Sequence, residues 1–534
     1  MDIFNVFKLK IIDIIKKLPL KIDEKVDLSL IQVTAPKEEK FGDLSTNAAL
    51  VLSKILCINT LELAQSIADK LLVVEKSSIA DIDIIKPGFI NISLNNNYWY
   101  QVLDAALNNA DKFGWEDIGK QQKINIEYVS ANPTGPMHIG HGRGAVIGDV
   151  LANLYSFFGY SVTKEYYVND AGNQIKGLAL SVYYRYCEKL GKDVEKPQDF
   201  YPGDYIIETA TKLIDKEGNK WLNREITEII LYFGSFAINY MMELIREDLV
   251  LLGIKHDIFS SEKEVSNDNV YNTLKQELLD KKLLYMGVLE PPKGTKAKVV
   301  EEDKIPSLLF RTSKFGDDSD RVVEKRDGSK TYFANDILYH DNKIKRGFNL
   351  MIDLLGVDHK GYQKRLQAAV KALSGGKSNL EVVFTELVNL LKDGAQVKMS
   401  KRAGTFITLR EVLEEVPKDA FRIMMLSRSN TSALDFDLAT ISEKSEKNPV
   451  YYLQYAYARI NSVFNKAKEI FTDLNEDEIL ASDKTLLKHE KELLVIKALA
   501  SYPKLLKSAL TNNNVHLIFV LLLNITKSIH ALWS

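Results

Sequence analysis

The stretch Lys123–Asp149 reads KINIEYVSANPTGPMHIGHGRGAVIGD and indicates the fold class of this 534-residue chain. Its first seven residues alternate apolar and polar side chains, which predicts a β-strand over Lys123–Val129. A loop rich in glycine and proline follows, and helical periodicity then extends from Ile139 to Phe158. A strand, a glycine-rich loop and a helix in this order begin a βα unit, which predicts an α/β protein with a Rossmann-type parallel sheet.

Strand and helix signals outside this stretch predict three domains. Strand candidates at Ser161–Val168, Leu350–Val357 and Glu381–Leu387 alternate with helical segments, as expected of a parallel sheet interrupted by an insertion over about residues 189–303. Leu50–Leu72 has helical spacing, and short β-branched runs flank the Pro87-Gly88 turn signal. Strand signals end near Leu409. We therefore predict an α+β domain over 1–111, a catalytic domain over 112–408 and an all-helical domain over 409–534.

The composition is that of an ordinary soluble protein, with 46% hydrophobic and 27% charged residues, which excludes a disordered or fibrous chain. Lys and Arg number 70 against 72 Asp and Glu, so the formal net charge is 70 − 72 = −2 and the molecule is not a polycation. Cys57 and Cys187 are too few for a disulfide framework or a cysteine-rich zinc site, so we expect a cytoplasmic protein without a structural metal. Lysines interrupt Met1–Leu20 and Leu517–Leu523 is short, so we predict no signal peptide and no membrane segment.

Two imidazoles, His138 and His141, lie at i and i+3 where the predicted helix begins. On one face of the first turn they can donate to phosphate oxygens whose charge grows in a transition state. The loop is neither a dinucleotide fingerprint nor a Walker loop, because no G-K-[ST] follows. The backbone is expected to approach a ligand closely at four glycines, Gly135, Gly140, Gly142 and Gly144. The alternative is a glycine-rich turn with two structural histidines.

A second motif, VKMSKRAG at Val397–Gly404, places Lys398, Lys401 and Arg402 in a short loop. Lysines among small residues suit the neutralisation of phosphate charge. A charge cluster of this kind is also typical of a solvated turn, so the motif gains its weight from its pairing with the histidine motif.

The strings HIGH (His138–His141) and KMSK (Lys398–Lys401) resemble the two signatures of class I aminoacyl-tRNA synthetases. Within that class the sequence is similar to the bacterial type of arginyl-tRNA synthetase. The matching phrases are EYVSANPTGPMHIGHGRGAVIGD, FGDLSTNAALVLSK at Phe41–Lys54, PGFINISL at Pro87–Leu94, YYVNDAGNQI at Tyr166–Ile175, YPGDYI at Tyr201–Ile206, YFANDILYH at Tyr332–His340, GVDHKGYQKRL at Gly356–Leu366 and NPVYYLQYAYARI at Asn448–Ile460.

The resemblance implies that ATP, with Mg²⁺ as its companion, activates L-arginine to arginyl-adenylate, which then reacts with the terminal ribose of tRNA(Arg). It implies catalytic roles for His138, His141, Lys398 and Lys401, with the lysines over the leaving pyrophosphate. The ATP contacts that it implies are Ala131, Asn132, Pro133, Thr134, Gly135, Pro136, Met137, His138, Ile139, Gly140, His141, His359, Met399, Ser400 and Lys401.

An arginine site needs carboxylates for a planar guanidinium, which they bind in bidentate fashion. The resemblance assigns this site to Glu127, Asn132, Glu262, Tyr332, Asp336 and Asp358. Core packing of Tyr332 and a surface position of Glu262 are the alternatives at those two positions.

The resemblance also implies that the helical domain binds the anticodon side of the tRNA, that the N-terminal module touches its elbow, and that the enzyme is a monomer. Tyr451 and Tyr455 fall on one helical face near Arg459, where the rings can stack on unpaired bases or pack a helix bundle. From Lys484 to the end, seven lysines stand against two acids, a balance of 7 − 2 = +5.

Family members usually continue past the part that matches Ser528–Trp533, whereas this sequence ends at Ser534. We therefore expect either a truncated sequence or a helical domain without its usual tail, with Phe519–Leu523 exposed. Two other functions remain alternatives. One is a class I synthetase for cysteine or glutamate, which the scarcity of cysteines and the Tyr332/Asp336 phrase oppose. The other is a non-catalytic RNA-binding relative, which the two intact signatures oppose.

Overall fold

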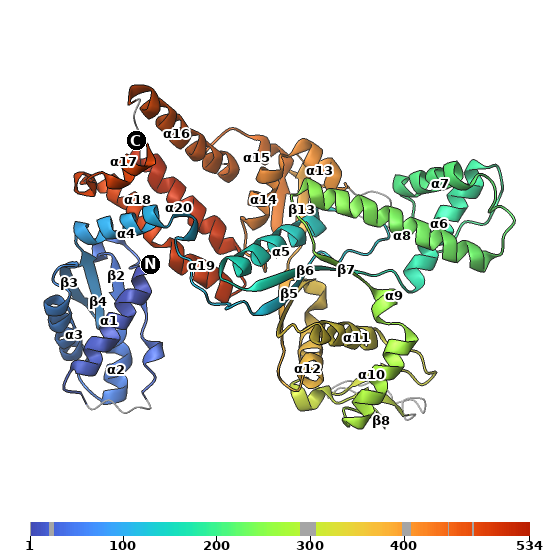
Figure 1. The fold of residues 1–534 in the computed structure, drawn as a ribbon, viewed down its shortest axis with the longest axis horizontal. Helices are drawn as coiled ribbons and strands as arrows, with labels where there is room; N and C mark the ends of the chain where they lie inside the picture. Colours follow the sequence, from blue (N-terminus) through green and yellow to red (C-terminus); the bar gives the residue numbers. More distant parts are fainter. Residues whose placement is uncertain are drawn as a thin grey trace. The chain divides into compact units, whose positions relative to one another are not determined.

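The computed structural model describes residues 2–20, 26–288, 306–392, 394–397, 407–446, 448–471 and 475–533. The chain forms two compact units (Figure 1). Asp117–Lys444 make up the first, here called the sheet unit. Met1–Glu116 and Ser445–Ser534 together make up the second, here called the terminal unit. Each is described by itself.

A five-stranded parallel sheet forms the centre of the sheet unit, with the strand order β12-β11-β5-β6-β7. The predicted strands are confirmed at β5 (Lys123–Glu127), β6 (Ser161–Val168), β11 (Leu350–Gly356) and β12 (Asn379–Thr385). The chain passes from β5 outward through β6 to β7 (Ile258–Ser261) and later adds β11 and β12 on the other side of β5. The order therefore reverses beside β5, and ligands of such sheets bind outside the carboxyl ends of the strands at this point.

Strand β7 corrects the predicted insertion. It lies inside residues 189–303 but pairs in parallel with β6, with Tyr166 opposite Phe259. The range is therefore not one uninterrupted insertion into the sheet. The sequence IFSS of β7 is four residues long and half polar, which is too short to give a period-two signal.

The other elements of the sheet unit surround this sheet or extend from it. They are α5 (Ile139–Phe157), α6 (Asn173–Lys189), α7 (Asp204–Glu217), α8 (Ile226–Leu251), α9 (Glu262–Val265), α10 (Asp268–Asp280), β8 (Leu284–Gly287), β9 (Ser307–Phe310), β10 (Arg321–Glu324), α11 (Tyr332–Lys345), α12 (Gln363–Leu373), β13 (Val388–Lys392), β14 (Ala395–Gln396), α13 (Leu409–Glu415), α14 (Lys418–Leu426), β15 (Leu434–Asp437) and α15 (Leu438–Ser442).

Strand β15 is a second correction, because no strand was expected after Leu409. It pairs in parallel with β13, and Phe436 stands opposite Leu390. The region between Leu409 and Lys444 thus belongs to the sheet unit rather than to a purely helical domain. The four residues LDFD contain alternating acids, so their apolar content alone did not identify a strand.

Helix α8 is long and apolar enough to cross a membrane by length and composition alone. One face of it, with Ile229, Phe233 and Met241, is buried in a cluster with α6 and α7. These side chains therefore serve the core of the helical extension formed by α6, α7 and α8.

The terminal unit combines both ends of the chain. Its N-terminal part holds α1 (Ile3–Lys17), β1 (Val33–Thr34), β2 (Leu44–Thr46), α2 (Ala48–Leu56), α3 (Thr60–Val74), β3 (Ile79–Ile85), β4 (Phe89–Leu94) and α4 (Asn96–Asn108). The strands form an antiparallel sheet in the order β1-β2-β4-β3, and the predicted turn at Pro87-Gly88 joins β3 to β4. Its C-terminal part is helical, with α16 (Pro449–Ile470), α17 (Glu476–Ala481), α18 (Glu490–Ala500), α19 (Tyr502–Thr511) and α20 (His516–Leu532).

The two parts of the terminal unit share one core, because Ile496 and Ala500 of α18 lie in the cluster that α1–α4 form. Several C-terminal lysines bind N-terminal acceptors: Lys497 pairs with Asp43 at 2.6 Å, and Lys507 with Glu116 at 2.7 Å. Part of the local charge excess predicted for this segment therefore holds the unit together. In the Phe519–Leu523 stretch, Phe519 and Leu521 are buried and Leu522 is exposed, so the expected exposure is limited to part of it.

The glycines of α5 differ in what surrounds them. A Cβ at Gly142 would lie 2.7 Å from the Phe421 ring and 2.9 Å from the side chain of Leu409, whereas one at Gly144 would meet nothing within 4 Å. Gly135 similarly faces the Tyr205 ring, at 3.0 Å. Gly135 and Gly142 thus also serve packing within the protein, and the close approach of a ligand at these glycines stays a prediction.

We predict opposite effects on stability for two alanine substitutions in α5. Gly142→Ala should lower the free energy of unfolding of the sheet unit by about 1–3 kcal/mol, because its methyl group overpacks the contact with α13 and α14. Gly144→Ala should leave it unchanged or raise it by about 0.5–1 kcal/mol, because alanine is the better helix former. Urea unfolding of both variants measures this difference, and equal effects would contradict the packing role of Gly142.

Candidate functional site

A cleft of about 640 Å³ opens at the carboxyl ends of β5 and β11. It brings together most of the residues predicted to bind ligands, although they come from four separate stretches of the chain. Those lining it are Glu127, Ala131, Asn132, His138, Gly140, His141, Glu262, Tyr332, Asp336, Asp358 and His359. An adjoining hollow of about 670 Å³ shares Asn132, Glu262 and Tyr332 with it, so the cleft continues past α11 towards α9 and α10.

The two histidines at the start of α5 form a reciprocal cap. His138 is the N-cap residue, and its Nδ1 accepts from the His141 backbone N–H at 3.4 Å, while Nδ1 of His141 accepts from the His138 backbone N–H at 3.2 Å. The rings stack with their centroids 3.7 Å apart. Because each Nδ1 accepts, the proton of each neutral ring is on Nε2. The cap thus fixes the tautomer that donates from Nε2 in both rings.

Most of the rest of the predicted ATP segment is buried rather than exposed in the cleft. Pro133, Thr134, Gly135, Pro136, Met137 and Ile139 are buried and do not line the cleft. Tyr166 donates to the Ala131 carbonyl at 2.8 Å, and Tyr205 to the Thr134 carbonyl at 3.1 Å. These two hydroxyls hold the loop between β5 and α5, so that it presents Asn132 and the histidines to the cleft.

Lys398, Met399, Ser400 and Lys401 lie outside the described residues. The flanks of this motif are placed beside α5. On the downstream side Thr408 forms a β-bridge with His138, and the Leu409 N–H donates to the Met137 carbonyl at 2.8 Å. On the upstream side the Val397 N–H donates to the Leu390 carbonyl at 2.9 Å. The flanks of the two sequence motifs are therefore neighbours in the fold.

Arg143 anchors α5 to the segments that precede β13 and β15. Its side chain is fully buried and donates to the backbone carbonyls of Glu386 at 3.0 Å, Ser429 at 2.9 Å and Ser432 at 2.9 Å. Neutral acceptors on two separate loops thus hold the guanidinium. This buried arginine, one turn after His138, ties the histidine motif to the segments around β13 and β15.

A row of three carboxylates crosses the sheet at the bottom of the cleft. Glu127 of β5 lies opposite Asp353 of β11 on one side and opposite Glu165 of β6 on the other. Directly paired residues point to the same face of the sheet, and all three are buried. Like charges at this spacing repel each other, so the row requires cations.

Helix α11 and its C-cap residue supply these cations. Lys343 donates to Glu127 at 2.7 Å and to Asp353 at 2.9 Å. Arg346 donates to both oxygens of Glu165, at 2.9 and 2.7 Å. His340 completes the set, with Nε2 2.9 Å from an Asp353 oxygen. The helix therefore carries a cation for every acid in the row, which we call the carboxylate row.

This pairing sets the ionisation of Asp353 and Glu165, whereas burial raises the pKa of Glu127 despite its contact with Lys343. Burial favours the neutral acid, but Lys343 and His340 overcome it and hold the pKa of Asp353 well below its usual range. Burial is likewise outweighed at Glu165, where Lys343, Ser260 and Arg346 lower the pKa. The pKa of Lys343 is raised, because the attraction of the acids exceeds the cost of its burial.

Two acids of the cleft lack such compensation. Burial raises the pKa of Asp336 from 3.8 to about 7, against the opposing effect of His340, and the carboxylates of Asp353 and Glu127 raise it further. No hydrogen bond to the Asp336 carboxylate is present in the described part of the chain. Burial also raises the pKa of Glu262, although Asn335 donates to it at 2.9 Å. A cation bound between these acids would restore their ionised form.

The remaining predicted residues are at the rim. Tyr332 is 82% exposed, which excludes core packing. Glu262 is buried, which excludes the alternative of a surface acid. His359 lies 3.4 Å from Asp358, and both are exposed. In the terminal unit, the rings of Tyr451 and Tyr455 stack 5.9 Å apart as their spacing predicts.

The tyrosine pair of α16 combines packing with exposure. Tyr455 stacks on His530 of α20 at 5.7 Å but is 45% exposed, and the Arg459 guanidinium lies 5.8 Å from its ring centroid. Tyr455 thus packs against neighbouring rings while nearly half of it stays exposed, so both interpretations of this residue remain open.

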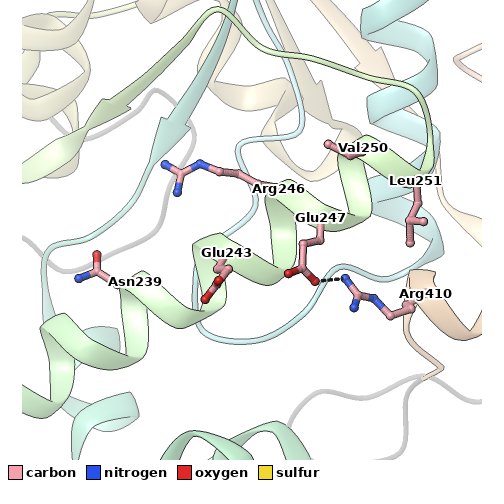
Figure 2. A pocket seen from close by; sticks show the side chains of 7 residues that line it. All are labelled: Asn239, Glu243, Arg246, Glu247, Val250, Leu251 and Arg410. Carbon is pink, nitrogen blue, oxygen red and sulfur yellow. Dashed lines mark hydrogen bonds and ion pairs between the residues drawn. The ribbon is translucent and has the colours of Figure 1, made fainter. Parts of the chain in front are cut away.

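A further hollow, of about 860 Å³, lies along α8 and contains no predicted site residue. Figure 2 shows its lining, in which Arg410 of α13 reaches the side chain of Glu247. Arg410 pairs with Glu247 at 2.8 Å and with Asp248 at 2.9 Å. The charge of Arg410 is thus already neutralised by two carboxylates. We therefore assign the functional site to the cleft at the carboxyl ends of β5 and β11.

Sequence reasoning missed the partners of the carboxylate row: His340, Lys343, Arg346, Glu165 and Asp353. A partial signal was available, because Asp353 stands in an otherwise apolar strand, and His340, Lys343 and Arg346 recur at helical spacing after Asp336. The signal did not indicate which acid pairs with which cation, because the pairs depend on which strands are neighbours in the sheet.

The fold and the cleft define a class of binding site. A histidine-capped helix at the switch point of a parallel sheet is placed to bind a phosphate, and the acids beside it are placed to bind a cation. Sequence models of three families match the chain. They are tRNA synthetases class I (R), catalytic domain, over 102–465, the arginyl tRNA synthetase N terminal domain over 5–94, and the DALR anticodon binding domain over 453–534.

Similar proteins agree with these matches. An arginine–tRNA ligase of Azorhizobium caulinodans is 45% identical over 542 residues, covering 100% of this chain and 92% of that protein. One of Agrobacterium fabrum is 45% identical over 543 residues, with the same coverage. The solved Thermus thermophilus arginyl-tRNA synthetase shares the fold, with a TM-score of 0.71, 18% identity and coverage of 99% of this chain and 91% of that one. The chain belongs to the arginyl-tRNA synthetase family of class I tRNA synthetases.

Proposed function

We propose that the chain is an arginine–tRNA ligase, which activates L-arginine with ATP and transfers it from arginyl-adenylate to the 3′ end of tRNA(Arg). The observation that carries this proposal is that one cleft contains both the histidine cap and two acids, Asp336 and Glu262, whose pKa values are raised by burial. The histidines suit phosphate, and the acids suit a guanidinium. The family membership of the chain supports the same activity.

The nucleotide binds at the end of the cleft formed by His138 and His141. Nε2 of His138 and of His141 donate to phosphate oxygens, and the N-terminus of α5 adds its backbone donors and dipole. Adenylate formation joins the arginine carboxylate to the α-phosphorus and expels pyrophosphate, so it needs alignment and charge stabilisation. Lys398 and Lys401 meet the pyrophosphate, Met399 and Ser400 lie between them in the same motif, and His359 lies on the adenosine side. Mg²⁺ enters as the companion of ATP.

Arginine takes the acidic end. Asp336 and Glu262 bind the guanidinium, Tyr332 covers it, and Asn132 and Asp358 lie towards the α-amino and carboxylate groups. Glu127 contributes differently. Its oxygens already accept from Lys343 at 2.7 Å and Ser130 at 3.0 Å, so it shapes the floor and acts on the ligand through its field.

The terminal unit takes the tRNA. Tyr451, Tyr455 and Arg459 offer stacked rings and a cation to the anticodon side, and the match to a DALR anticodon binding domain supports this role.

The enzyme works in the cytoplasm as a monomer. Its two cysteines, of which Cys57 is exposed and Cys187 is buried, are both free thiols, as a reducing compartment requires.

The direct test is amino-acid-dependent ATP–pyrophosphate exchange in the presence of tRNA(Arg). Arginine should support exchange, and lysine, glutamate and cysteine should not, because a guanidinium-shaped acid site leaves its buried acids unpaired with other side chains. Asp336→Asn should raise the arginine KM by about 100-fold or more, with a far smaller change in the ATP KM, because it removes one partner of a buried charge pair.

The control is Asp280→Asn, which makes the same change at an exposed acid at the end of α10. Its arginine KM should equal that of the wild type. Exchange supported by another amino acid, or an unchanged KM in Asp336→Asn, would refute the assignment. Absence of exchange with retained tRNA binding would favour a non-catalytic RNA-binding protein.

Activation and tRNA binding should separate by mutation. Tyr455→Ala should weaken tRNA binding about 10-fold, because a base loses its stacking partner. Tyr457→Ala is the matched control, since that ring is 73% exposed two positions further along α16. Lys401→Ala should instead depress exchange at saturating tRNA. Filter binding and exchange rates measure the two effects, and equal losses of the chemical step in both variants would contradict this division.

A further inference from the structure

His340 makes two hydrogen bonds that a neutral imidazole cannot make together. The side chain is 3% exposed and lies one helical turn after Asp336 on α11. Its Nδ1 is 2.8 Å from the backbone carbonyl oxygen of Asp336, and its Nε2 is 2.9 Å from a carboxylate oxygen of Asp353. A neutral ring has a hydrogen on one nitrogen only.

Both partners of His340 are acceptors. A backbone carbonyl never donates, so Nδ1 must carry a hydrogen. The other oxygen of Asp353 accepts from the Lys343 ammonium at 2.9 Å, in a pair that is buried on both sides. This contact favours the ionised carboxylate, so Nε2 must carry a hydrogen as well.

The charges of the carboxylate row are compatible with this state. Asp353, Glu127 and Glu165 bring three carboxyl groups to one face of the sheet, and burial raises the pKa of Glu127 against the attraction of Lys343. Lys343 and Arg346 bring two positive charges within hydrogen-bond distance of them. A doubly protonated His340 adds a third beside Asp353, and the row is neutral when Glu127 is ionised as well. Buried ionised groups without such pairing are costly.

We propose that His340 is a positioning residue, held as an imidazolium, that fixes the first turns of α11 and favours the ionised form of the neighbouring Asp336, to which arginine binds. This rests on the proposed function of Asp336 in binding the guanidinium. The imidazolium acts twice. Its Nδ1–H holds the Asp336 carbonyl, and its charge stands one helical turn from the Asp336 carboxylate.

The charged groups around His340 explain why its own charge matters. Asp336 and Lys343 face it from α11, Asp353 from β11 and Glu127 from β5. Towards Asp336, the carboxylates of Asp353, Glu127 and Glu262 all favour the neutral acid, and His340 is the cation that opposes them. Without that cation the arginine pocket would hold a neutral Asp336 over more of the physiological pH range.

The test is the pH dependence of arginine binding in His340→Gln. Equilibrium dialysis with labelled arginine, from about pH 5.5 to about pH 9, gives the midpoint below which affinity falls as Asp336 takes up its proton. Glutamine can still donate to the Asp336 carbonyl but carries no charge. The midpoint should move up by about 1 pH unit or more, the effect of losing an opposite charge at this distance. A purely structural role would weaken binding equally at all pH values and leave the midpoint in place.

Two variants accompany this measurement. His489→Asn changes an exposed histidine that caps α18 in the terminal unit and keeps a good capping residue, so its midpoint should equal that of the wild type. Asp336→Asn should abolish the pH-dependent limb. If Asp336→Asn still shows the limb, the proposed function of Asp336 fails. If it abolishes the limb but His340→Gln leaves the midpoint unmoved, the role of His340 alone fails.

The wild-type enzyme offers a readout that does not depend on how well the variant folds. With ¹⁵N-labelled histidine, the His340 ring at neutral pH should show protons on both nitrogens, whereas a neutral ring shows one. The His340→Gln spectrum identifies the resonance by its loss, and the assignment can be repeated with His340→Asn if the first variant is insoluble. A single ring proton on His340 at about pH 7 would overturn the proposal.

Discussion

The buried ammonium of Lys343 is the interaction on which the catalytic cleft depends. It bridges Glu127 and Asp353, which are neighbours across the two strands that meet at the switch point of the sheet. Removing one partner of such a buried pair costs about 3–5 kcal/mol, because the remaining charge stays buried without compensation. The bridge therefore fixes α11 on the sheet, and with it every side chain that α11 presents to the cleft.

The contrast between compensated and uncompensated acids gives the site its selectivity. The carboxylate row is matched by cations of α11, whereas the carboxylates of Asp336 and Glu262 form no ion pair in the described part of the chain. A ligand with a planar cation pairs with these two acids. The pKa of about 7 at Asp336 shows how strongly burial disfavours the ionised carboxylate in the absence of such a ligand. The histidine cap of α5 serves the nucleotide at the other end. Residues of α5, α11 and α9 thus bring two chemistries together in one cleft.

Much of the fold could be predicted from the sequence, because β5, β6, β11 and α5 have clear periodicity. The resemblance also pointed to acids of the cleft: Asp336 stands in the matching phrase Tyr332–His340, whereas Glu262 lies outside the matching phrases and had a surface position as its alternative. The short strands β7 and β15 were missed because four residues carry too little pattern. The cations of the carboxylate row were missed for another reason: their partners lie on strands distant in sequence, and only the strand order brings them together. The KMSK motif lies outside the described residues, so its role stays a prediction.

Proton release on arginine binding tests the central claim most directly. Isothermal titration calorimetry of the wild-type enzyme in buffers of different ionisation enthalpy measures the protons released per arginine bound. A free-state pKa of about 7 at Asp336 and an ionised form in the complex predict release of about 0.9 proton at pH 6 and almost none at about pH 8.5. A proton count of zero at both pH values would show that arginine does not bind to an uncompensated acid, and would contradict the site described above.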